Sequence, residues 1–94
     1  MATYILLSTI TPQGAQTLKA TPERLLEVNR EIEALGARVI NQWAVLGPYD
    51  FVSVVEAPDE RTISRVSIAL GSRGSARFET LTAMSVEEFL DLHR

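Results

Sequence analysis

Six side chains in this sequence combine a reactive or ligand-contacting chemistry with a position on an expected strand or turn. They are the candidate ligand-binding residues Tyr4, Trp43, Tyr49, Asp50, Arg77 and Glu79, with no catalytic residue assigned. Trp43 or Tyr4 could stack on a flat ligand, because an aromatic ring offers a large apolar face. Asp50 or Glu79 could accept a proton, and polar strand residues such as Arg77 could help to orient a planar substrate.

The aromatic residues and Asp50 also have a purely structural interpretation. Tyr49 and Asp50 follow Gly47-Pro48 in an expected turn, where an aspartate commonly bonds turn amides and the tyrosine would pack over the strand ends. We favour that interpretation for the pair. Trp43, the only tryptophan, is more often a core or dimer-interface residue than a ligand platform when it lies on a strand.

Several chemistries are excluded or disfavoured by what the chain contains. There is no cysteine, which excludes disulfides, thiol catalysis and thiolate metal sites. His93 is the sole histidine and the penultimate residue, so we expect no metal site. The glycine-containing segment 71–75 follows a helix, whose nearby dipole end is negative and disfavours phosphate. We therefore expect no cofactor.

Composition narrows the possible partners and compartment. The 94 residues carry a formal net charge of −3, which argues against a dedicated nucleic-acid binder because phosphate neutralisation needs basic residues. No segment approaches the ~20 apolar residues of a membrane span, and the start of the chain lacks a secretory signal pattern. We expect a cytoplasmic protein without a nucleic-acid or membrane partner.

The pattern of elements predicts one domain over residues 1–94. Strands are expected at Ala2–Ile10, Arg38–Leu46, Phe51–Ala57 and Ala76–Met84, with helices from Thr21-Pro22-Glu23 to Gly36, from Pro58-Asp59-Glu60 to Gly71, and after Ser85. Residues 11–20 stay ambiguous between a short helix and a loop. This βαββαβ order predicts an α+β, ferredoxin-like fold with helices on one face of a four-stranded antiparallel sheet. The predicted strand order is fourth, first, third, second.

The helices that start at Thr21 and at Pro58 lie on one face of the predicted sheet and cannot cover its other face. Strand side chains alternate between the two faces of a sheet. In the second and third strands, however, the residues expected on each face are largely apolar. A large exposed apolar patch usually marks a contact surface, so we predict a homodimer that packs sheet against sheet. The alternative is that the C-terminal helix covers this face through Phe89, Leu90 and Leu92. Polar residues on the strands suggest that a dimer would enclose a cavity for a small ligand.

Four stretches together resemble the GYD-domain family. They are the turn Gly47-Pro48-Tyr49-Asp50-Phe51-Val52, the opening Ala2-Thr3-Tyr4-Ile5, the stretch Val55-Glu56-Ala57-Pro58-Asp59 and the ending Thr82-Ala83-Met84-Ser85-Val86-Glu87-Glu88-Phe89. The resemblance implies a dimeric α/β barrel of the ferredoxin-like type. That superfamily includes cofactor-free monooxygenases, haem-binding enzymes, lactone isomerases and amino-acid-sensing domains. No general activity carries over from the GYD family, because fold does not settle function.

Three functional hypotheses remain open from the sequence. The preferred one is a ligand-binding or assembly domain that forms a homodimer or higher homo-oligomer without established catalysis. The alternative is a cofactor-independent monooxygenase or isomerase that acts on a small planar substrate in the barrel. The third is a purely structural assembly protein, so whether the chain is an enzyme stays open.

Overall fold

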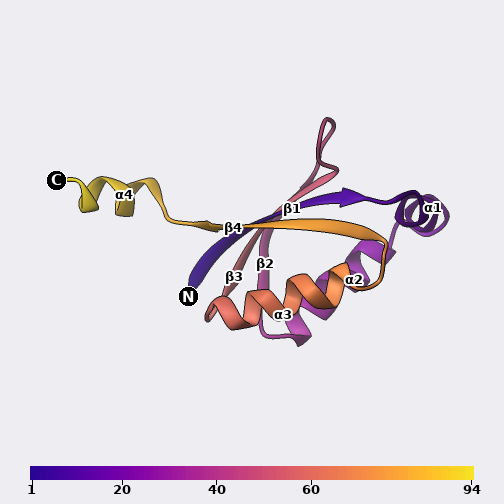
Figure 1. The fold of residues 1–94 in the computed structure, drawn as a ribbon, viewed down its shortest axis with the longest axis horizontal. Helices are drawn as coiled ribbons and strands as arrows, with labels where there is room; N and C mark the ends of the chain where they lie inside the picture. Colours follow the sequence, from indigo (N-terminus) through magenta and orange to yellow (C-terminus); the bar gives the residue numbers. More distant parts are fainter.

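The computed structural model describes residues 1–94 as four strands and four helices. The elements are β1 (Ala2–Ile10), α1 (Pro12–Ala20), α2 (Arg24–Ala34), β2 (Arg38–Ala44), β3 (Phe51–Ala57), α3 (Glu60–Gly71), β4 (Ala76–Ala83) and α4 (Val86–Leu92). All strand pairs are antiparallel, and the order across the sheet is β2-β3-β1-β4. The fold is the expected α+β, ferredoxin-like arrangement, with α2 and α3 along one face of the sheet (Figure 1).

The core lies between the sheet and the helices α2 and α3. On β1, Tyr4, Leu6 and Ser8 are buried while the residues between them are only half-buried. This period of two follows from the alternation of side chains along a strand. The buried apolar residues are Tyr4, Leu6, Ile32, Ala37, Val55, Ala57, Ile63, Val66 and Leu70. We call this side of the sheet the helix face and the other side the open face.

A bulge in β2 changes which of its residues share a face. Val39 lies opposite Val55, but Asn41 lies opposite Val54, and the register shifts between them. A bulge adds one unpaired residue to a strand, so side chains beyond it change face. The sequence pattern places Val39 and Trp43 on one face. That expectation is wrong, because Val39 faces the helices whereas Trp43 lies on the open face.

The ambiguous segment 11–20 forms the helix α1. Thr11 caps it by accepting a hydrogen bond from the Gly14 amide at 3.1 Å, and the Thr11 hydroxyl donates to the Gly74 carbonyl at 2.7 Å. A Cβ atom on Gly14 would lie 2.0 Å from the Ser75 carbonyl oxygen. Glycine therefore permits close packing of α1 against the end of α3 and the start of β4, although glycine weakens a helix intrinsically.

The start Thr21-Pro22-Glu23 predicts that the Thr21 side chain caps the first free amides of the helix α2, and the structure differs there, whereas the end of the helix at Gly36 agrees with the prediction. The helix begins at Arg24 after a turn, and no side chain caps it; the Thr21 carbonyl oxygen, rather than its hydroxyl, accepts from the Arg24 amide at 3.1 Å. Gly36 follows the helix with φ of 100°. A residue with a side chain rarely adopts that conformation, so glycine suits the end of the helix.

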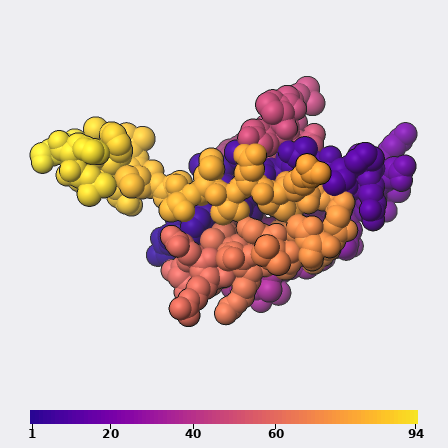
Figure 2. Space-filling model, in the orientation of Figure 1, coloured from indigo at the N-terminus to yellow at the C-terminus, as the bar shows by residue number.

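The C-terminal helix α4 does not cover the sheet. Ser85 caps it through a hydrogen bond from the Glu88 amide at 3.1 Å, as its sequence predicts. However, α4 extends beyond the end of the sheet as a separate projection (Figures 1 and 2). Phe89, Leu90 and Leu92 are all exposed. The expectation that these three side chains pack against the domain is therefore wrong for the single chain.

Asp59 gives α3 a titratable cap. Its carboxylate accepts hydrogen bonds from the Thr62 amide and the Thr62 hydroxyl, both at 2.9 Å. The bond from the Thr62 amide is the main cause that lowers the pKa of Asp59 below its ordinary value of 3.8, and the Thr62 hydroxyl adds to it. A carboxylate with a lowered folded-state pKa stabilises the protein above its unfolded pKa, and this contribution is lost as pH falls through the folded value.

We therefore predict that stability depends on pH partly through Asp59. In urea titrations from about pH 5 to about pH 2, the unfolding midpoint should fall more steeply for the natural protein than for Asp59→Asn. Asparagine keeps a capping oxygen but does not titrate. Parallel curves for the two proteins over this range would contradict the assignment.

Candidate functional site

The open face is an apolar surface that no helix of the chain covers. Its apolar residues come from all four strands: Ile5, Leu7, Trp43, Val52, Val54 and Leu81. Val54 lies opposite Ile5, and Val52 lies between Leu7 and Trp43 in the paired register. The Trp43 side chain is 52% exposed. Contiguous apolar surface of this kind marks a contact site more often than an isolated exposed residue does.

A hydrogen bond between Tyr49 and Glu79 connects the β2–β3 turn to β4 on the open face. The Tyr49 hydroxyl donates to Glu79 Oε2 at 2.8 Å, and Glu79 lies opposite Leu7 in the register. This bond is the main cause that raises the pKa of Tyr49 above its ordinary value of 10.0, and the charge of Glu79 adds to it. Tyr49 is therefore a neutral hydrogen-bond donor over the physiological pH range.

Asp50 joins the turn to β1. The Ile10 amide donates to Asp50 Oδ2 at 2.7 Å, and the Asp50 amide donates to the Ser8 carbonyl at 2.8 Å. The Val45 amide donates to the Asp50 carbonyl at 2.8 Å. These three bonds hold the turn against the sheet, and they direct the Asp50 carboxylate to a backbone amide of a neighbouring strand.

The six candidate residues do not converge on one point. Trp43, Tyr49, Arg77 and Glu79 share the open face, where Arg77 lies opposite Thr9. Trp43 is on the edge strand β2 while Arg77 and Glu79 are on the other edge strand β4, which places them about 14 Å apart across three strand spacings. Tyr4 lies in the core on the helix face and is 2% exposed. Burial is the main cause that raises its pKa.

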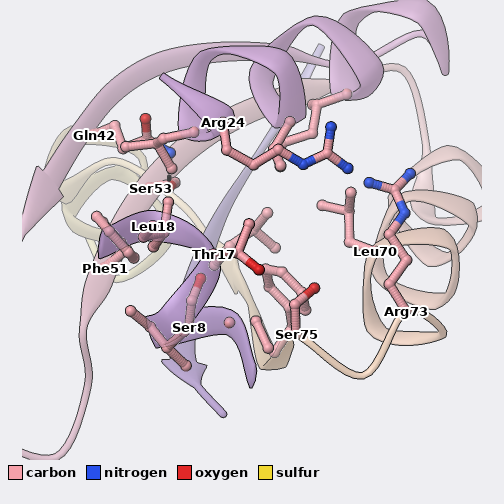
Figure 3. A pocket seen from close by; sticks show the side chains of 18 of the residues that line it. Ser8, Thr17, Leu18, Arg24, Gln42, Phe51, Ser53, Leu70, Arg73 and Ser75 are labelled. Atoms are coloured by element: carbon pink, nitrogen blue, oxygen red, sulfur yellow. Dashed lines mark hydrogen bonds between the residues drawn. The ribbon is translucent and has the colours of Figure 1, made fainter. Parts of the chain in front are cut away.

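A cavity of about 280 Å³ lies on the helix face, between the sheet and the helices α1, α2 and α3 (Figure 3). Its lining includes Ser8 and Ser53 on the strands, and Arg24 and Arg73 on the helical side. None of the six candidate residues lines it. The sequence-based reasoning expected a cavity between two sheets, and the observed one lies inside a single chain. The available signal was the polar residues at helix-facing strand positions.

Beside this cavity, Gln42 and Asn29 form a small polar network. Gln42 Nε2 donates to Asn29 Oδ1 at 3.2 Å and to Ser53 Oγ at 3.0 Å, and Asn29 Nδ2 donates to Gln42 Oε1 at 2.9 Å. The network links α2 to β2 and β3. Because a buried polar group is costly without a partner, these bonds fix the position of Ser53.

Two further features bear on the class of site. The structure contains no cluster of three or more histidine, cysteine, aspartate or glutamate side chains that could hold a metal ion. None of its helices has the length and apolar character of a membrane span.

Comparison with known proteins identifies the family. The sequence model of the GYD domain matches residues 4–92. The chain belongs to the GYD-domain family. A Thermus thermophilus protein named glutamine synthetase and cystathionine beta-lyase binding protein is 53% identical over 91 residues, which are 96% of each chain. The resemblance seen in the turn and the flanking stretches is thus confirmed for the GYD chain as a whole.

Solved structures agree with the fold of this GYD protein. The crystal structure of TTHA0845, also from Thermus thermophilus, superposes with a TM-score of 0.58 and 26% identity over 90% of this chain and 95% of that chain. Hypothetical protein PHS023 from Pyrococcus horikoshii gives a TM-score of 0.56 with 21% identity over 90% and 92% of the two chains. At that identity, the second likeness speaks for the fold alone.

Proposed function

We propose that this GYD protein is a homodimeric protein-binding module without catalysis of its own. The observation that carries the proposal is the uncovered open face. Apolar side chains on all four strands face solvent there, and water contact with such a surface is unfavourable by about 25 cal/mol for each Å². A second copy is the simplest cover, because a two-fold axis presents the same apolar face from both sides.

The projecting helix α4 supports the same arrangement. It follows β4, whose Leu81 and Ala83 belong to the open face, and its apolar residues are exposed. A helix as short as Val86–Leu92 is not stable in water without packing. Seated against the second copy, Phe89 and Leu90 would leave the solvent and the helix would gain that packing.

The candidate residues acquire roles within this arrangement. Trp43 lies within the proposed dimer contact, where a large aromatic side chain is a typical anchor. Arg77, Glu79 and Tyr49 lie at the β4 side and the turn, where they would form a polar border. Tyr4 stabilises the fold as part of the core, and Asp50 stabilises the turn through its hydrogen bonds. The lack of cysteine suits the reducing cytoplasm, and we propose that the protein binds its partners there.

The partner class follows from the relative that shares half of the sequence. That relative is named as a binding protein for glutamine synthetase and cystathionine beta-lyase, and the similarity covers 96% of its length. We therefore extend the proposal to these two enzymes as the partners of this GYD dimer.

The test uses glutamine synthetase and cystathionine beta-lyase purified from the organism that encodes this chain. Biolayer interferometry with the immobilised GYD protein should give saturable binding to at least one of them, with a Kd at or below about 10 μM. An unrelated acidic enzyme of similar size is the control. Failure of both enzymes to bind at ten times that concentration would overturn the partner assignment.

No observation favours the monooxygenase or isomerase alternative. Such an enzyme needs a base within hydrogen-bond reach of its substrate. Asp50 accepts from the Ile10 amide and Glu79 accepts from the Tyr49 hydroxyl. Each carboxylate is thus engaged with a group of the chain itself, and neither lines the helix-face cavity.

A further inference from the structure

We propose that the cavity on the helix face is a binding site for a small aromatic or other apolar molecule that carries a carboxylate at one end and a hydroxyl or carbonyl oxygen at the other. The site is distinct from the protein-binding surface, because it lies on the opposite side of the same sheet. Its volume is about 280 Å³, and an apolar cavity of about 150 Å³ already admits benzene. A substituted ring therefore fits.

The floor of the cavity offers two hydroxyl groups to the polar end of a ligand. Ser8 is 7% exposed, and its hydroxyl oxygen points into the cavity in Figure 3 without a hydrogen-bond partner in the chain. Ser53 Oγ accepts from Gln42, which leaves its own hydrogen free to donate. Ser53 lies opposite Leu6, and Ser8 opposite Phe51, so the serines are diagonal neighbours on one face, about 7–8 Å apart, and each presents its own hydroxyl to a ligand.

The walls above these hydroxyls are apolar. They include Phe51, Phe78, Leu25, Val28, Ile32 and Leu70, from two strands and two helices. Two phenylalanine rings make the site suitable for a flat ring, because aromatic groups pack edge to face or offset against each other. A charged group would be unfavourable at this depth without a partner.

The mouth carries two guanidinium groups. Arg24 on α2 and Arg73 after α3 direct their guanidinium groups toward each other across the opening (Figure 3). Arg24 pairs with Glu27, and Arg73 pairs with Glu31. Each pair involves one guanidinium nitrogen, so both arginines keep donors for a carboxylate. The two glutamates balance the charge of the arginines, which limits attraction of anions that lack an apolar body.

Three probe molecules of similar shape test the contribution of each end of the site to binding. They are 4-hydroxyphenylacetate, phenylacetate without the hydroxyl, and 2-(4-hydroxyphenyl)ethanol without the carboxylate. In isothermal titration calorimetry, 4-hydroxyphenylacetate should bind roughly tenfold more tightly than each of the others, because each lacks one hydrogen-bonded end. Equal affinity for all three, or no binding of any at millimolar concentration, would overturn the proposal.

Two substitutions test which end of the site binds the hydroxyl and which binds the carboxylate, and two matched substitutions serve as controls. Ser8→Ala should weaken 4-hydroxyphenylacetate about tenfold and leave phenylacetate unchanged, while Arg73→Gln should weaken both acids and leave the alcohol unchanged. The controls Ser64→Ala and Arg65→Gln replace exposed residues of α3 and should change nothing. The same loss for every probe in Ser8→Ala would contradict the assigned orientation. Binding of the two enzyme partners is measured in parallel. Failure of the small-molecule site can then be distinguished from failure of the protein-binding function.

Discussion

Replacing Val54 by lysine is expected to convert the dimer into a folded monomer. Val54 lies on the central strand β3 and faces the open side, opposite Ile5. In the single chain this lysine would reach solvent, so the fold should tolerate it. In the dimer, two ammonium groups would be buried without partners, which costs several kcal/mol for each. The dimer Kd should therefore rise by about a thousandfold or more.

The measurement is sedimentation velocity over a wide range of protein concentration. Ile68→Lys is the matched control, because Ile68 is an exposed apolar residue of α3, outside the open face. That protein should remain a dimer. A Val54→Lys protein that sediments as a dimer would exclude the open face as the interface, and a monomeric natural protein would remove the basis of the homodimer itself.

Removing residues 85–94 is expected to weaken the dimer strongly while leaving the stability of the single chain unchanged. In the structure α4 projects away from the sheet (Figure 1), and its apolar residues stay exposed. Its loss therefore removes little packing from the chain itself. If Phe89 and Leu90 pack against the second copy, burial of two such side chains is lost at each of two sites, which corresponds to at least about a hundredfold rise in the dimer Kd.

Two measurements distinguish a role of α4 in dimer formation from a role in the stability of its own chain. Urea unfolding is measured on the truncated chain in the Val54→Lys background, where the midpoint should match that of full-length Val54→Lys. The dimer Kd is measured by sedimentation for the truncated natural chain and for Phe89→Glu, both of which should be weakened. Glu87→Gln on the same helix is the control with an unchanged Kd. A truncation that lowers the monomer midpoint would show that α4 packs within its own chain.

Sequence reasoning succeeded for the elements whose signal is local. The strands Ala2–Ile10 and Phe51–Ala57 end where turn residues interrupt an apolar run, and their predicted bounds match the structure. The helix start at Pro58-Asp59-Glu60 and the helix end at Gly36 follow from short-range hydrogen bonding and sterics in the same way. Such features depend on a few consecutive residues, so the pattern contains them.

Apart from the cap at the start of α2, the features that the sequence missed or left open depend on distant contacts. Segment 11–20 stayed ambiguous in sequence partly because of Gly14, whereas in the fold this glycine permits the close approach of Ser75, about sixty residues away in the chain. The bulge after Val39 moved Trp43 to the open face, and no local pattern marks it. The cavity is formed by three helices and the sheet together, so its lining could not be read from spacing along the chain.

The irregularity in β2 also affects how large an assembly can grow. β2 forms one margin of the sheet, and its register shifts between Val39 and Asn41. An edge strand with evenly spaced amide and carbonyl groups is a template for a further strand from another molecule, and a bulge disturbs that template. The margin formed by β4 is regular along its pairing with β1. Ribbon-like growth by strand addition is thus hindered at one end of the sheet, which favours closed particles over fibres.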